Sequence, residues 1–415
     1  MDKPQKLEEN DHKKLGRELD LFVFSDLVGP GLPLWTPRGT VLRNELDRFV
    51  QEMRDEHGFQ AITTPHITKR DLYERSGHWK KFSDELFKIT SREKHEFALK
   101  PMNCPHHTQI YASRPRSYKE LPIRYRETTM DYRDEQTGEL NGILRPRAFT
   151  QDDAHVFCRE DQIQGEVLKI WDIVSRFYDV VNLPLSVRLS MRDQGNLDAY
   201  AGKAKQWDYA ESQLGEVLKK ITSIDHRDDG AGEAAFYGPK LDFIAKDSLG
   251  REWQVATIQL DFAQPEGLDL GYIDEKGKTE RPVMIHCAIM GSIERFLAVY
   301  IEHVGGNFPV WLAPEQLRVI SLNDDKGVIH KCWEILDKAK ELGLRVELDN
   351  ANESVGKKIR EAEVMKVPYT VVVGGKEVES GQVSPRVRSD LKLEKESFTV
   401  DEFLEKLSQD AKTRK

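Results

Sequence analysis

Residues 253–262 read Trp-Gln-Val-Ala-Thr-Ile-Gln-Leu-Asp-Phe and form the longest of three strand-like stretches that decide the fold. Shorter ones lie at Leu241–Ala245 and Val283–His286, with turn residues at Asp247–Gly250 and Asp274–Lys278 between them. β-branched and aromatic residues bounded by such turns are typical of strands joined in hairpins. Strands of this kind with helices around them favour an antiparallel sheet and an α+β fold.

The residues before these strands predict a hairpin and several helices. In 121–160, β-like pieces surround a turn at Glu135–Gly142, which is typical of a hairpin with a long loop. A strand is expected at Phe59–Pro65, after Gly58. Apolar residues at helical spacing predict helices over 12–24, 40–57, 161–181 and 203–222.

The pattern changes after Pro314. Strand-like and helix-like segments then alternate, at Arg318–Leu322, 327–342, Arg345–Leu348, 354–364 and Tyr369–Val373, and a last helix is expected over 397–411. A βαβαβ order implies a parallel sheet with helices on its faces. We therefore predict two domains, residues 1–313 with the antiparallel sheet and residues 314–415 as a small α/β domain.

The composition excludes several classes of protein. Of 415 residues, 32% are charged and 39% hydrophobic, and the net charge is −9. No apolar run approaches the roughly 18–20 residues that a membrane-spanning helix needs, and residues 1–10 are too polar for a secretory signal. Four cysteines without a CxxC pair predict reduced thiols. We expect a cytoplasmic protein, with no membrane partner, that contacts any nucleic acid through local basic patches.

Arginine and aromatic residues gather at the two ends of the predicted hairpin and at a later strand–helix junction. Arg133 and Glu135 precede the hairpin loop, Arg145 and Phe149 follow it, and Arg295 opens a helix directly after a strand. An arginine binds phosphate and stacks on rings, so an arginine and a phenylalanine can hold a purine between them. Taken singly, each arginine is better explained as a surface ion pair. Their joint position at strand ends is what indicates a nucleotide site.

Three residues far apart in the sequence have side chains that bind zinc. Cys104, His155 and His286 show none of the short spacings of a structural zinc site, so spacing alone favours a buried cysteine and two core histidines. If they converge, three protein ligands leave one coordination position open to substrate. His78 follows a predicted loop and is either a proton-transfer group or a surface imidazole. The Asp152–Asp153 pair is expected near buried surface.

Taken together, these segments resemble the class II aminoacyl-tRNA synthetases and, within them, the threonyl-tRNA synthetase family. Residues 31–65 resemble motif 1, which builds the dimer interface in that class, while 133–155 resemble motif 2 and 291–296 motif 3. Met102–Pro105 and Gln151–His155 narrow the resemblance to the synthetases that are specific for threonine. It covers nearly the whole chain and implies a class II antiparallel sheet flanked by helices, followed by an α/β anticodon-binding domain.

The resemblance implies one zinc ion per subunit, bound by Cys104, His155 and His286, which reverses the interpretation from spacing. Threonine and valine are nearly the same size, and an apolar pocket separates such pairs by only on the order of a hundredfold. A zinc ion with an open position that takes the amino and hydroxyl groups of threonine excludes valine. The resemblance also implies that Asp153 bonds the threonine hydroxyl, in a pocket lined by Met102, Gln151, Asp153, Tyr237 and Gln259.

For ATP, the resemblance implies that Arg133 holds the threonine carboxylate and the α-phosphate, and that Arg295 and Phe149 sandwich the adenine. Glu135 would accept a hydrogen bond from the adenine amine, and Arg145 would meet the distal phosphates, with Mg2+ bridging them. Fixed guanidinium groups stabilise the negative charge that builds at the α-phosphate. Arg133 and Arg295 are therefore predicted catalytic residues.

Further expectations concern tRNA(Thr). His78 matches a family histidine that assists attack by the terminal ribose hydroxyl on the threonyl adenylate, and is the third predicted catalytic residue. Base-facing segments of the family's anticodon-binding domain correspond here to Asn352, Arg360, Glu377, Arg386 and Arg388. From residue type alone, Arg360 and Arg388 are explained equally well as surface charges in contact with solvent. The predicted assembly is a homodimer through motif 1.

The sequence departs from the family near the predicted pocket. His106 stands where the family more often has glycine, Val255-Ala256 replaces a Cys-Gly pair, and Cys287 replaces an arginine. The chain begins almost at the catalytic domain, so we expect a form without N-terminal editing domains. The main hypothesis is ATP-dependent attachment of L-threonine to tRNA(Thr). The alternative is a synthetase-like tRNA-binding paralogue with altered or absent catalysis, and the retained arginines and metal ligands favour the enzyme.

Overall fold

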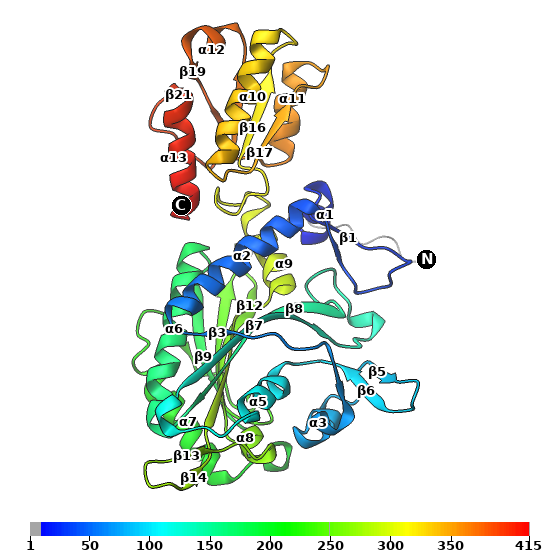
Figure 1. Ribbon diagram of the computed structural model, residues 1–415, viewed down its shortest axis with the longest axis vertical. Coiled ribbons are helices and arrows are strands. Elements are labelled where there is room, and N and C mark those ends of the chain that lie inside the picture. The colour runs from blue at the N-terminus through cyan, green and yellow to red at the C-terminus, as the bar shows by residue number, and fades with distance from the viewer. Residues whose placement is uncertain (1–9, 249, 415) are drawn as a thin grey trace. The chain divides into compact units, whose positions relative to one another are not determined.

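The computed structural model describes residues 10–248 and 250–414, so the expectation about residues 1–10 falls almost entirely outside it (Figure 1). The chain divides into two compact units. The larger holds residues 24–33 and 47–300, and the smaller holds the described residues up to 23, 34–46 and those from 301 onward. The division predicted at residues 313 and 314 stays a prediction. Among the described residues, no helix is both long and apolar enough to cross a membrane.

The larger unit is built around one eight-stranded sheet, in the order β10-β9-β11-β12-β15-β8-β7-β3. Neighbours from β9 through β7 run antiparallel, while β10 and β3 pair parallel at the two edges. The predicted antiparallel sheet of an α+β fold is confirmed, with a parallel strand added at each edge. The strands are β3 (Gln60–Ala61), β7 (Ile123–Tyr132), β8 (Ala148–Cys158), β9 (Leu185–Ser190), β10 (Asp225–Arg227), β11 (Lys240–Lys246), β12 (Glu252–Asp261) and β15 (Val283–Ser292).

Helices cover one face of this sheet with their apolar sides. Helix α6 (Ile163–Val180) packs on β12 and β15, and α7 (Ala204–Leu218) packs on β9 (Figure 1). Phe177 of α6 stacks on Phe49 of α2 (Pro37–Glu56), with ring centres 5.6 Å apart. It also meets Phe296 of α9 (Ile293–Val304) edge to face at 5.3 Å. These contacts make that face the main core of the unit.

The opposite face of the sheet is polar. Along β8, Gln151, Asp153 and His155 alternate with Asp152 and Ala154, so the two sets project to opposite sides. The register places His155 opposite His286 on β15, and His286 opposite Gln259 on β12. Residues that are distant in the sequence therefore share one sheet face, and this is where the predicted site residues gather.

The other elements of the larger unit are short. Strands β4, β5 and β6 make a three-stranded sheet, and β13 and β14 make a hairpin. The bounds are β4 (Ile67–Lys69), α3 (Arg70–Arg75), α4 (His78–Lys81), β5 (Lys88–Thr90), β6 (Glu96–Leu99), α5 (Cys104–Ala112), α8 (Ala263–Gly267), β13 (Tyr272–Ile273) and β14 (Thr279–Glu280).

The smaller unit contains the predicted βαβαβ arrangement. Its four-stranded sheet has the order β17-β16-β18-β20, with the first three strands parallel and β20 antiparallel. Val319, Cys332, Val371 and Phe403 lie in its buried apolar core. The bounds are β16 (Leu317–Ser321), α10 (Lys326–Glu341), β17 (Val346–Asp349), α11 (Val355–Val364), β18 (Tyr369–Val373), α12 (Gly375–Ser380), β19 (Gln382–Val383), β20 (Arg386–Val387), β21 (Phe398–Thr399) and α13 (Val400–Lys412).

Three expected element boundaries are wrong. The helix predicted over 12–24 is shorter, α1 (His12–Glu18). It ends there because Asp20 adopts a left-handed φ of 52°. The apolar residues that follow form strand β1 (Phe22–Val23), which pairs with β2 (Leu34–Trp35). The strand expected at 59–65 keeps only two residues, since the Thr64 N–H bonds the Glu127 carboxylate instead of a neighbouring strand. Strand β15 runs six residues beyond His286, to Ser292.

Candidate active site

A cavity of about 320 Å³ opens on the polar face of the sheet. Its walls come from α5, β8, β12 and β15 and from the segments beside them. They include all three residues predicted to bind a metal and all five predicted to bind threonine, namely Cys104, His155, His286, Met102, Gln151, Asp153, Tyr237 and Gln259. The structure therefore brings these eight residues together around one space.

The three predicted metal ligands form a buried cluster. The ligand atoms of Cys104, His155 and His286 all lie within 4.8 Å of one another. Nε2 of His155 is 2.9 Å from Nδ1 of His286, so these two nitrogens face the same point. The three residues are buried, as spacing alone indicated, and they also converge, because strand register joins β8 to β15 and helix α5 lies close to both.

A chain of hydrogen bonds fixes the outer nitrogen of His155. Its Nδ1 lies 2.8 Å from Nδ1 of His107, whose Nε2 lies 3.3 Å from the Glu127 carboxylate. Glu127 accepts further bonds from the backbone N–H and the hydroxyl of Thr64. If His107 donates to Glu127, it accepts from Nδ1–H of His155, which leaves Nε2 of His155 free to bind a metal.

His286 and Cys104 are held in a similar way. Nε2 of His286 donates to Oδ2 of Asp261 at 3.0 Å, which leaves Nδ1 free on the cavity side. Gln264 donates from Nε2 to that same carboxylate oxygen at 2.8 Å, and its Nε2 lies 3.6 Å from Sγ of Cys104. Every candidate ligand thus has a partner that orients it, which is the usual construction of a zinc site.

The chemistry of the donor set also fits zinc. Burial lowers the pKa of His155 well below its usual value, so the imidazole is a neutral ligand. Burial, with the nearby Asp153 carboxylate, raises the pKa of the Cys104 thiol well above its usual value. A cation at the cluster reverses this preference, because it stabilises the thiolate. Two imidazoles and a thiolate are ligands that zinc prefers and leave a fourth position open.

Sequence reasoning missed the four residues that orient these ligands. His107, Glu127, Asp261 and Gln264 contact the cluster or its first partners, as described above. Part of the signal was present: His107 lies one helical turn after Cys104, and Asp261 lies two residues after Gln259 on one strand. Glu127 and Gln264 could be placed only from the three-dimensional register.

The predicted threonine pocket surrounds the open side of the cluster. The Tyr237 ring stacks on His286 with centres 4.9 Å apart, and its hydroxyl donates to the side-chain oxygen of Gln259. Asp153 is 6% exposed, and its Oδ1 lies 3.8 Å from Nε2 of His155. A carboxylate oxygen in this position can accept a hydrogen bond from a hydroxyl group held at the cluster.

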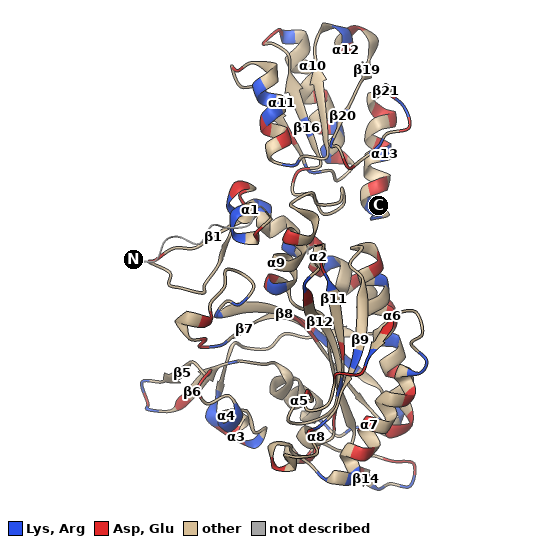
Figure 2. Cartoon of the chain, turned by 180° about the vertical axis from the view of Figure 1, so that it is seen from behind, with Lys and Arg blue, Asp and Glu red and all other residues tan. Residues whose placement is uncertain are grey.

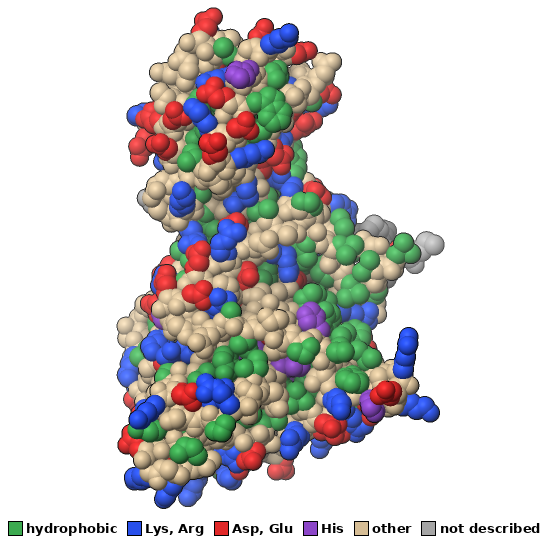
Figure 3. All heavy atoms as spheres, in the orientation of Figure 1, with side chains coloured by type: hydrophobic (Ala, Val, Ile, Leu, Met, Phe, Trp, Pro, Cys, Tyr) green, Lys and Arg blue, Asp and Glu red, His purple; other side chains and the backbone are tan. Residues whose placement is uncertain are grey.

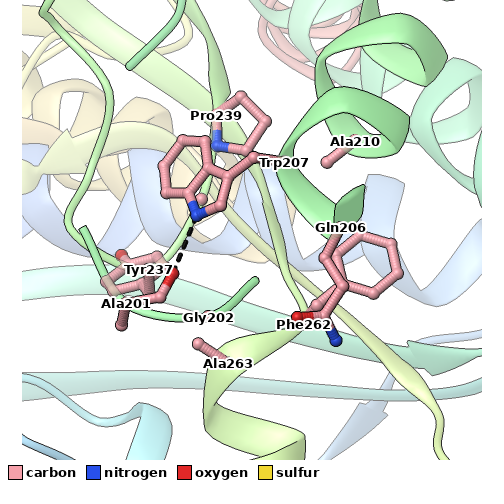
Figure 4. A pocket seen from close by; sticks show the side chains of 10 residues that line it. Ala201, Gly202, Gln206, Trp207, Ala210, Tyr237, Pro239, Phe262 and Ala263 are labelled. Atoms are coloured by element: carbon pink, nitrogen blue, oxygen red, sulfur yellow. Dashed lines mark hydrogen bonds between the residues drawn. The ribbon is translucent and has the colours of Figure 1, made fainter. Parts of the chain in front are cut away.

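A second, smaller cavity lies on the other side of Tyr237. It has about 200 Å³ of empty space, part of it open to solvent, and a mainly apolar lining that includes Pro239 and Phe262 (Figure 4). There the indole N–H of Trp207 donates to the carbonyl of Ala201 at 2.7 Å. Tyr237 lines both cavities.

Three predicted ATP-binding arginines lie close enough to influence one another. The Arg133 guanidinium lies 5.2 Å from the centre of the Phe149 ring and 5.6 Å from that of Phe82. Partial burial, together with the charges of Arg133 and Arg145, lowers the pKa of Arg295. Three neighbouring cations repel one another, carboxylates such as Glu135 offset part of that charge, and a polyphosphate can bind to the remainder.

The structure pairs the other two predicted ATP contacts with each other. Nη2 of Arg145 lies 2.7 Å from Oε2 of Glu135, in the loop between β7 and β8. The prediction gave Glu135 to the adenine amine and Arg145 to the distal phosphates. Binding ATP through both residues therefore requires this ion pair to rearrange.

His78 is a buried residue rather than the surface imidazole of the alternative interpretation. It is 0% exposed at the start of α4, and its ring stacks on Phe82 at 5.6 Å. Nδ1 lies 2.9 Å from the Ser76 hydroxyl, and Nε2 lies 3.6 Å from Sγ of Cys104. Burial above all lowers the pKa of His78 to about 3, so the ring is neutral near pH 7.

The five predicted anticodon residues lie in the smaller unit but not in one group. Arg386 and Arg388 line the same groove, whereas Asn352 and Arg360 are exposed elsewhere, Arg360 on helix α11, which carries charges of both signs (Figure 2). Glu377 accepts from the Gly374 N–H at 2.8 Å and so caps α12.

Arg388 is not the solvated surface charge of the alternative interpretation. Its side chain is 9% exposed and pairs with Asp390 at 2.6 Å. The same guanidinium donates to the carbonyls of Lys366 and Phe308, both at 2.8 Å. These bonds give Arg388 a structural role within the smaller unit.

Comparisons with known proteins agree with this arrangement. A model of the tRNA synthetase class II core domain (G, H, P, S and T) matches residues 87–304, and one of an anticodon binding domain matches 316–410. The chain belongs to the class II aminoacyl-tRNA synthetases. A crystal structure described as the RNA binding domain of threonyl-tRNA synthetase from Cryptosporidium parvum Iowa II has 36% sequence identity and a TM-score of 0.89, over 96% of this chain and 98% of that one.

Within this class, the chain belongs to the threonyl-tRNA synthetase family. The threonine–tRNA ligases of Prosthecochloris aestuarii and Deinococcus radiodurans are 45% and 44% identical over 98% and 97% of the chain. The chain spans 62% of the length of each of these relatives. A prolyl-tRNA synthetase from Giardia lamblia, in complex with prolyl-adenylate, shares the fold at 18% identity and a TM-score of 0.72, over 97% of this chain and 79% of that one.

Proposed function

We propose that this chain attaches L-threonine to tRNA(Thr) in an ATP-dependent reaction that passes through a threonyl adenylate. The observation that carries the proposal is the single cavity in which a Cys/His/His cluster meets a buried carboxylate, in a chain of the threonyl-tRNA synthetase family. The alternative, a tRNA-binding paralogue without catalysis, gives no reason for each ligand to keep an orienting partner.

Cys104, His155 and His286 would hold one zinc ion per subunit. Zinc bound there would supply a Lewis acid that interacts with the amino and hydroxyl groups of threonine. Asp153 accepts the hydroxyl hydrogen bond, and Tyr237 and Gln259 close one side of the pocket, with Met102 and Gln151 on others. Valine leaves the buried Asp153 carboxylate without a partner, and an unpaired buried polar group is strongly disfavoured.

The arginines act on ATP, bound with Mg2+. The charge of Arg133 influences the ionisation both of Tyr237, which lines the cavity, and of Arg295, so Arg133 can hold the threonine carboxylate and the α-phosphate in line for attack. Arg295 and Phe149 hold the adenine, Glu135 accepts from its amine, and Arg145 meets the distal phosphates. Their fixed positive charges stabilise the negative charge that develops at the α-phosphate.

The remaining roles concern tRNA. His78 is neutral and lies beside the metal cluster. Both ring nitrogens have partners, Ser76 and Cys104, so accepting a hydrogen bond from the terminal ribose hydroxyl requires one of these contacts to open. In the smaller unit, Asn352, Arg360, Glu377 and Arg386 are proposed to contact the anticodon. Arg388 would act there by holding its segment in place.

A direct test is aminoacylation of a tRNA(Thr) transcript by the purified chain, with threonine and ATP. We expect charging that depends on both, with release of pyrophosphate. A folded chain that binds the transcript but charges none of it would contradict the proposed function and support the paralogue.

We also propose a homodimer through the segment that resembles motif 1, residues 31–65, together with the exposed residues directly before it. Phe24, Leu27 and Val28 are 43%, 99% and 45% exposed, and apolar side chains gather over this part of the surface (Figure 3). A contiguous group of exposed apolar residues is typical of an interface. The occupant we assign to it is a second copy of this chain.

Leu27→Glu should weaken this dimer, because the new carboxylate must be desolvated at the interface. We expect the dissociation constant of the dimer to rise by about 100-fold, in line with a few kcal/mol for such burial. Analytical ultracentrifugation over a concentration series measures it, with the equally apolar Leu27→Met as the control. A monomeric wild-type chain would contradict the proposal, and so would a dimer that Leu27→Glu leaves intact.

A further inference from the structure

Arg54 is a fully buried arginine beneath the sheet face opposite the cavity. It lies in the last turn of α2 and is 0% exposed. Its Nη2 donates to the backbone carbonyl of Asp152 at 2.6 Å and lies 3.2 Å from Oδ2 of that residue. Its Nη1 reaches the carbonyl of Asp153 at 3.4 Å. One guanidinium therefore holds two consecutive peptide groups of β8.

The Asp152 carboxylate extends this connection to β15. Its Oδ2 accepts from the Ile289 N–H at 2.7 Å, and its Oδ1 accepts from the Met290 N–H at 3.0 Å. Directly after them, Gly291 adopts a φ of 75°, where an added Cβ would lie 2.8 Å from the Val255 carbonyl. This turn leads into α9, on which Arg295 stands.

We propose that Arg54 is a positioning residue that sets the substrate pocket from behind the sheet. Strand alternation sends Asp152 toward Arg54 and its neighbour Asp153 into the cavity. Fixing the peptide groups at 152 and 153 therefore fixes the Asp153 carboxylate and, two residues on, His155. Through Asp152, the same guanidinium also holds the turn before Arg295. The inference rests on the proposed function, since it names what orients the threonine and ATP contacts.

Loss of the Arg54 charge should disturb the site more than an ordinary loss of packing. Without it, the Asp152 carboxylate is a buried charge without its cation, and two carbonyls lose their donor. Removing one partner of a buried ion pair is strongly destabilising, because the other charge stays behind. The displacement falls on β8 at Asp153, and small displacements of substrate contacts lower rates by large factors.

The structure also offers a way to restore the cation from another strand. Cys287 of β15 is the register partner of Ala154 of β8 and alternates with His286, so its side chain lies on the Arg54 face. Burial raises the pKa of the Cys287 thiol, and among charged groups Arg54 has the largest effect on that pKa, which it lowers. An arginine at position 287 can therefore reach toward Asp152 once the Arg54 side chain is gone.

The test compares Arg54→Leu, Arg54→Lys and the double variant Arg54→Leu/Cys287→Arg with the wild-type chain. The matched control is Arg124→Leu, which breaks another sheet-to-helix ion pair, with Glu166 at 2.8 Å. We measure KM for threonine and kcat in ATP–pyrophosphate exchange, the thermal midpoint, and hydrogen exchange of the amides at 150–156.

We expect Arg54→Leu to lower kcat/KM for threonine by about 100-fold and to speed amide exchange at 150–156. Arg54→Lys should fall between it and the wild type, and the double variant should recover at least tenfold. Arg124→Leu should lower the thermal midpoint but keep KM within about twofold, because the Arg124 guanidinium bonds Glu166 of α6 and not the backbone of β8 at Asp152 and Asp153. If Arg54→Leu does not fold, the lysine and double variants carry the comparison.

The experiment distinguishes a failure of the proposed function from a failure of the inference about Arg54. An inactive wild-type chain contradicts the proposed function, and the amide exchange at 150–156 then still tests whether Arg54 holds β8. An active wild type whose Arg54 variants keep its KM, kcat and amide exchange would overturn the inference. The inference would also be overturned if Arg54→Leu and Arg124→Leu had the same thermal midpoint and Arg54→Leu lowered kcat/KM no more than Arg124→Leu did.

Discussion

Cys104→Ala should lose the bound zinc and lower threonine-dependent ATP–pyrophosphate exchange by about three orders of magnitude. The variant keeps two imidazoles but removes the thiolate, and two neutral ligands hold zinc far more weakly than three. The Lewis acid contributes several kcal/mol to such a site, which corresponds to a factor of this size. Zinc per chain is measured by elemental mass spectrometry, and the rate by incorporation of labelled pyrophosphate into ATP.

The control for this variant is Cys332→Ala, which removes an equally buried thiol from the core of the smaller unit. It should keep its zinc and an exchange rate within about twofold of the wild type, because Cys332 belongs to the core of the other compact unit. A Cys104→Ala chain with a full complement of zinc and an unchanged rate would show that the cluster is not the metal site that we propose.

Arg133→Ala should lower kcat for exchange by about 100- to 1,000-fold, the usual effect of removing a donor aimed at developing negative charge. Arg133 stacks near Phe149 and Phe82 and lies within the field of Arg295. Arg133→Lys should recover only part of the rate, since an ammonium keeps the charge but loses the planar fork. Steady-state exchange at saturating ATP and threonine measures both variants.

Arg126→Ala is the matched control for this second variant. Arg126 stands on the same strand, β7, but its guanidinium bonds Asp55 at 2.8 Å and Gln51 at 2.6 Å, away from the arginine cluster. Its kcat should stay within about threefold of the wild type. Equal losses in Arg133→Ala and Arg126→Ala would mean that the hairpin needs its arginines for stability and not for chemistry.

The sequence was sufficient for the parts of the fold that depend on local pattern. β-branched and aromatic residues between turns predicted β11 and β12, and helical periodicity predicted α2 and α6, within a few residues of their observed bounds. It failed where one residue overrides the pattern. The left-handed Asp20 ends α1 early, and the Glu127 carboxylate takes the Thr64 N–H that a longer β3 would need.

The candidate site, like the fold, was predicted from the sequence only in part. The arginines, the metal ligands and the threonine pocket were predicted from motif resemblance, and they gather as expected. Spacing alone could not join Cys104 to His155 and His286, because that contact depends on which strands are neighbours. Arg54 was not predicted at all, since its partner Asp152 lies 98 positions away. Nothing local distinguishes it from the other arginines on the same helix.

The Asp152–Asp153 pair shows what the structure adds. Sequence placed both near buried surface, and both are buried. The strand then separates them: Asp153 lines the cavity, while Asp152 bonds Arg54 and two backbone N–H groups of β15. Two identical neighbouring residues thus have different roles because a strand has two faces.

The central claim is that a metal-bearing pocket in this chain activates threonine and rejects valine. The most direct measurement is ATP–pyrophosphate exchange by the zinc-loaded chain with threonine, serine or valine as the only amino acid. We predict exchange with threonine, weaker exchange with serine, which also has a hydroxyl group, and none with valine. A folded, zinc-loaded chain that supports no exchange with any of the three would contradict the account, as would one that accepts valine as readily as threonine.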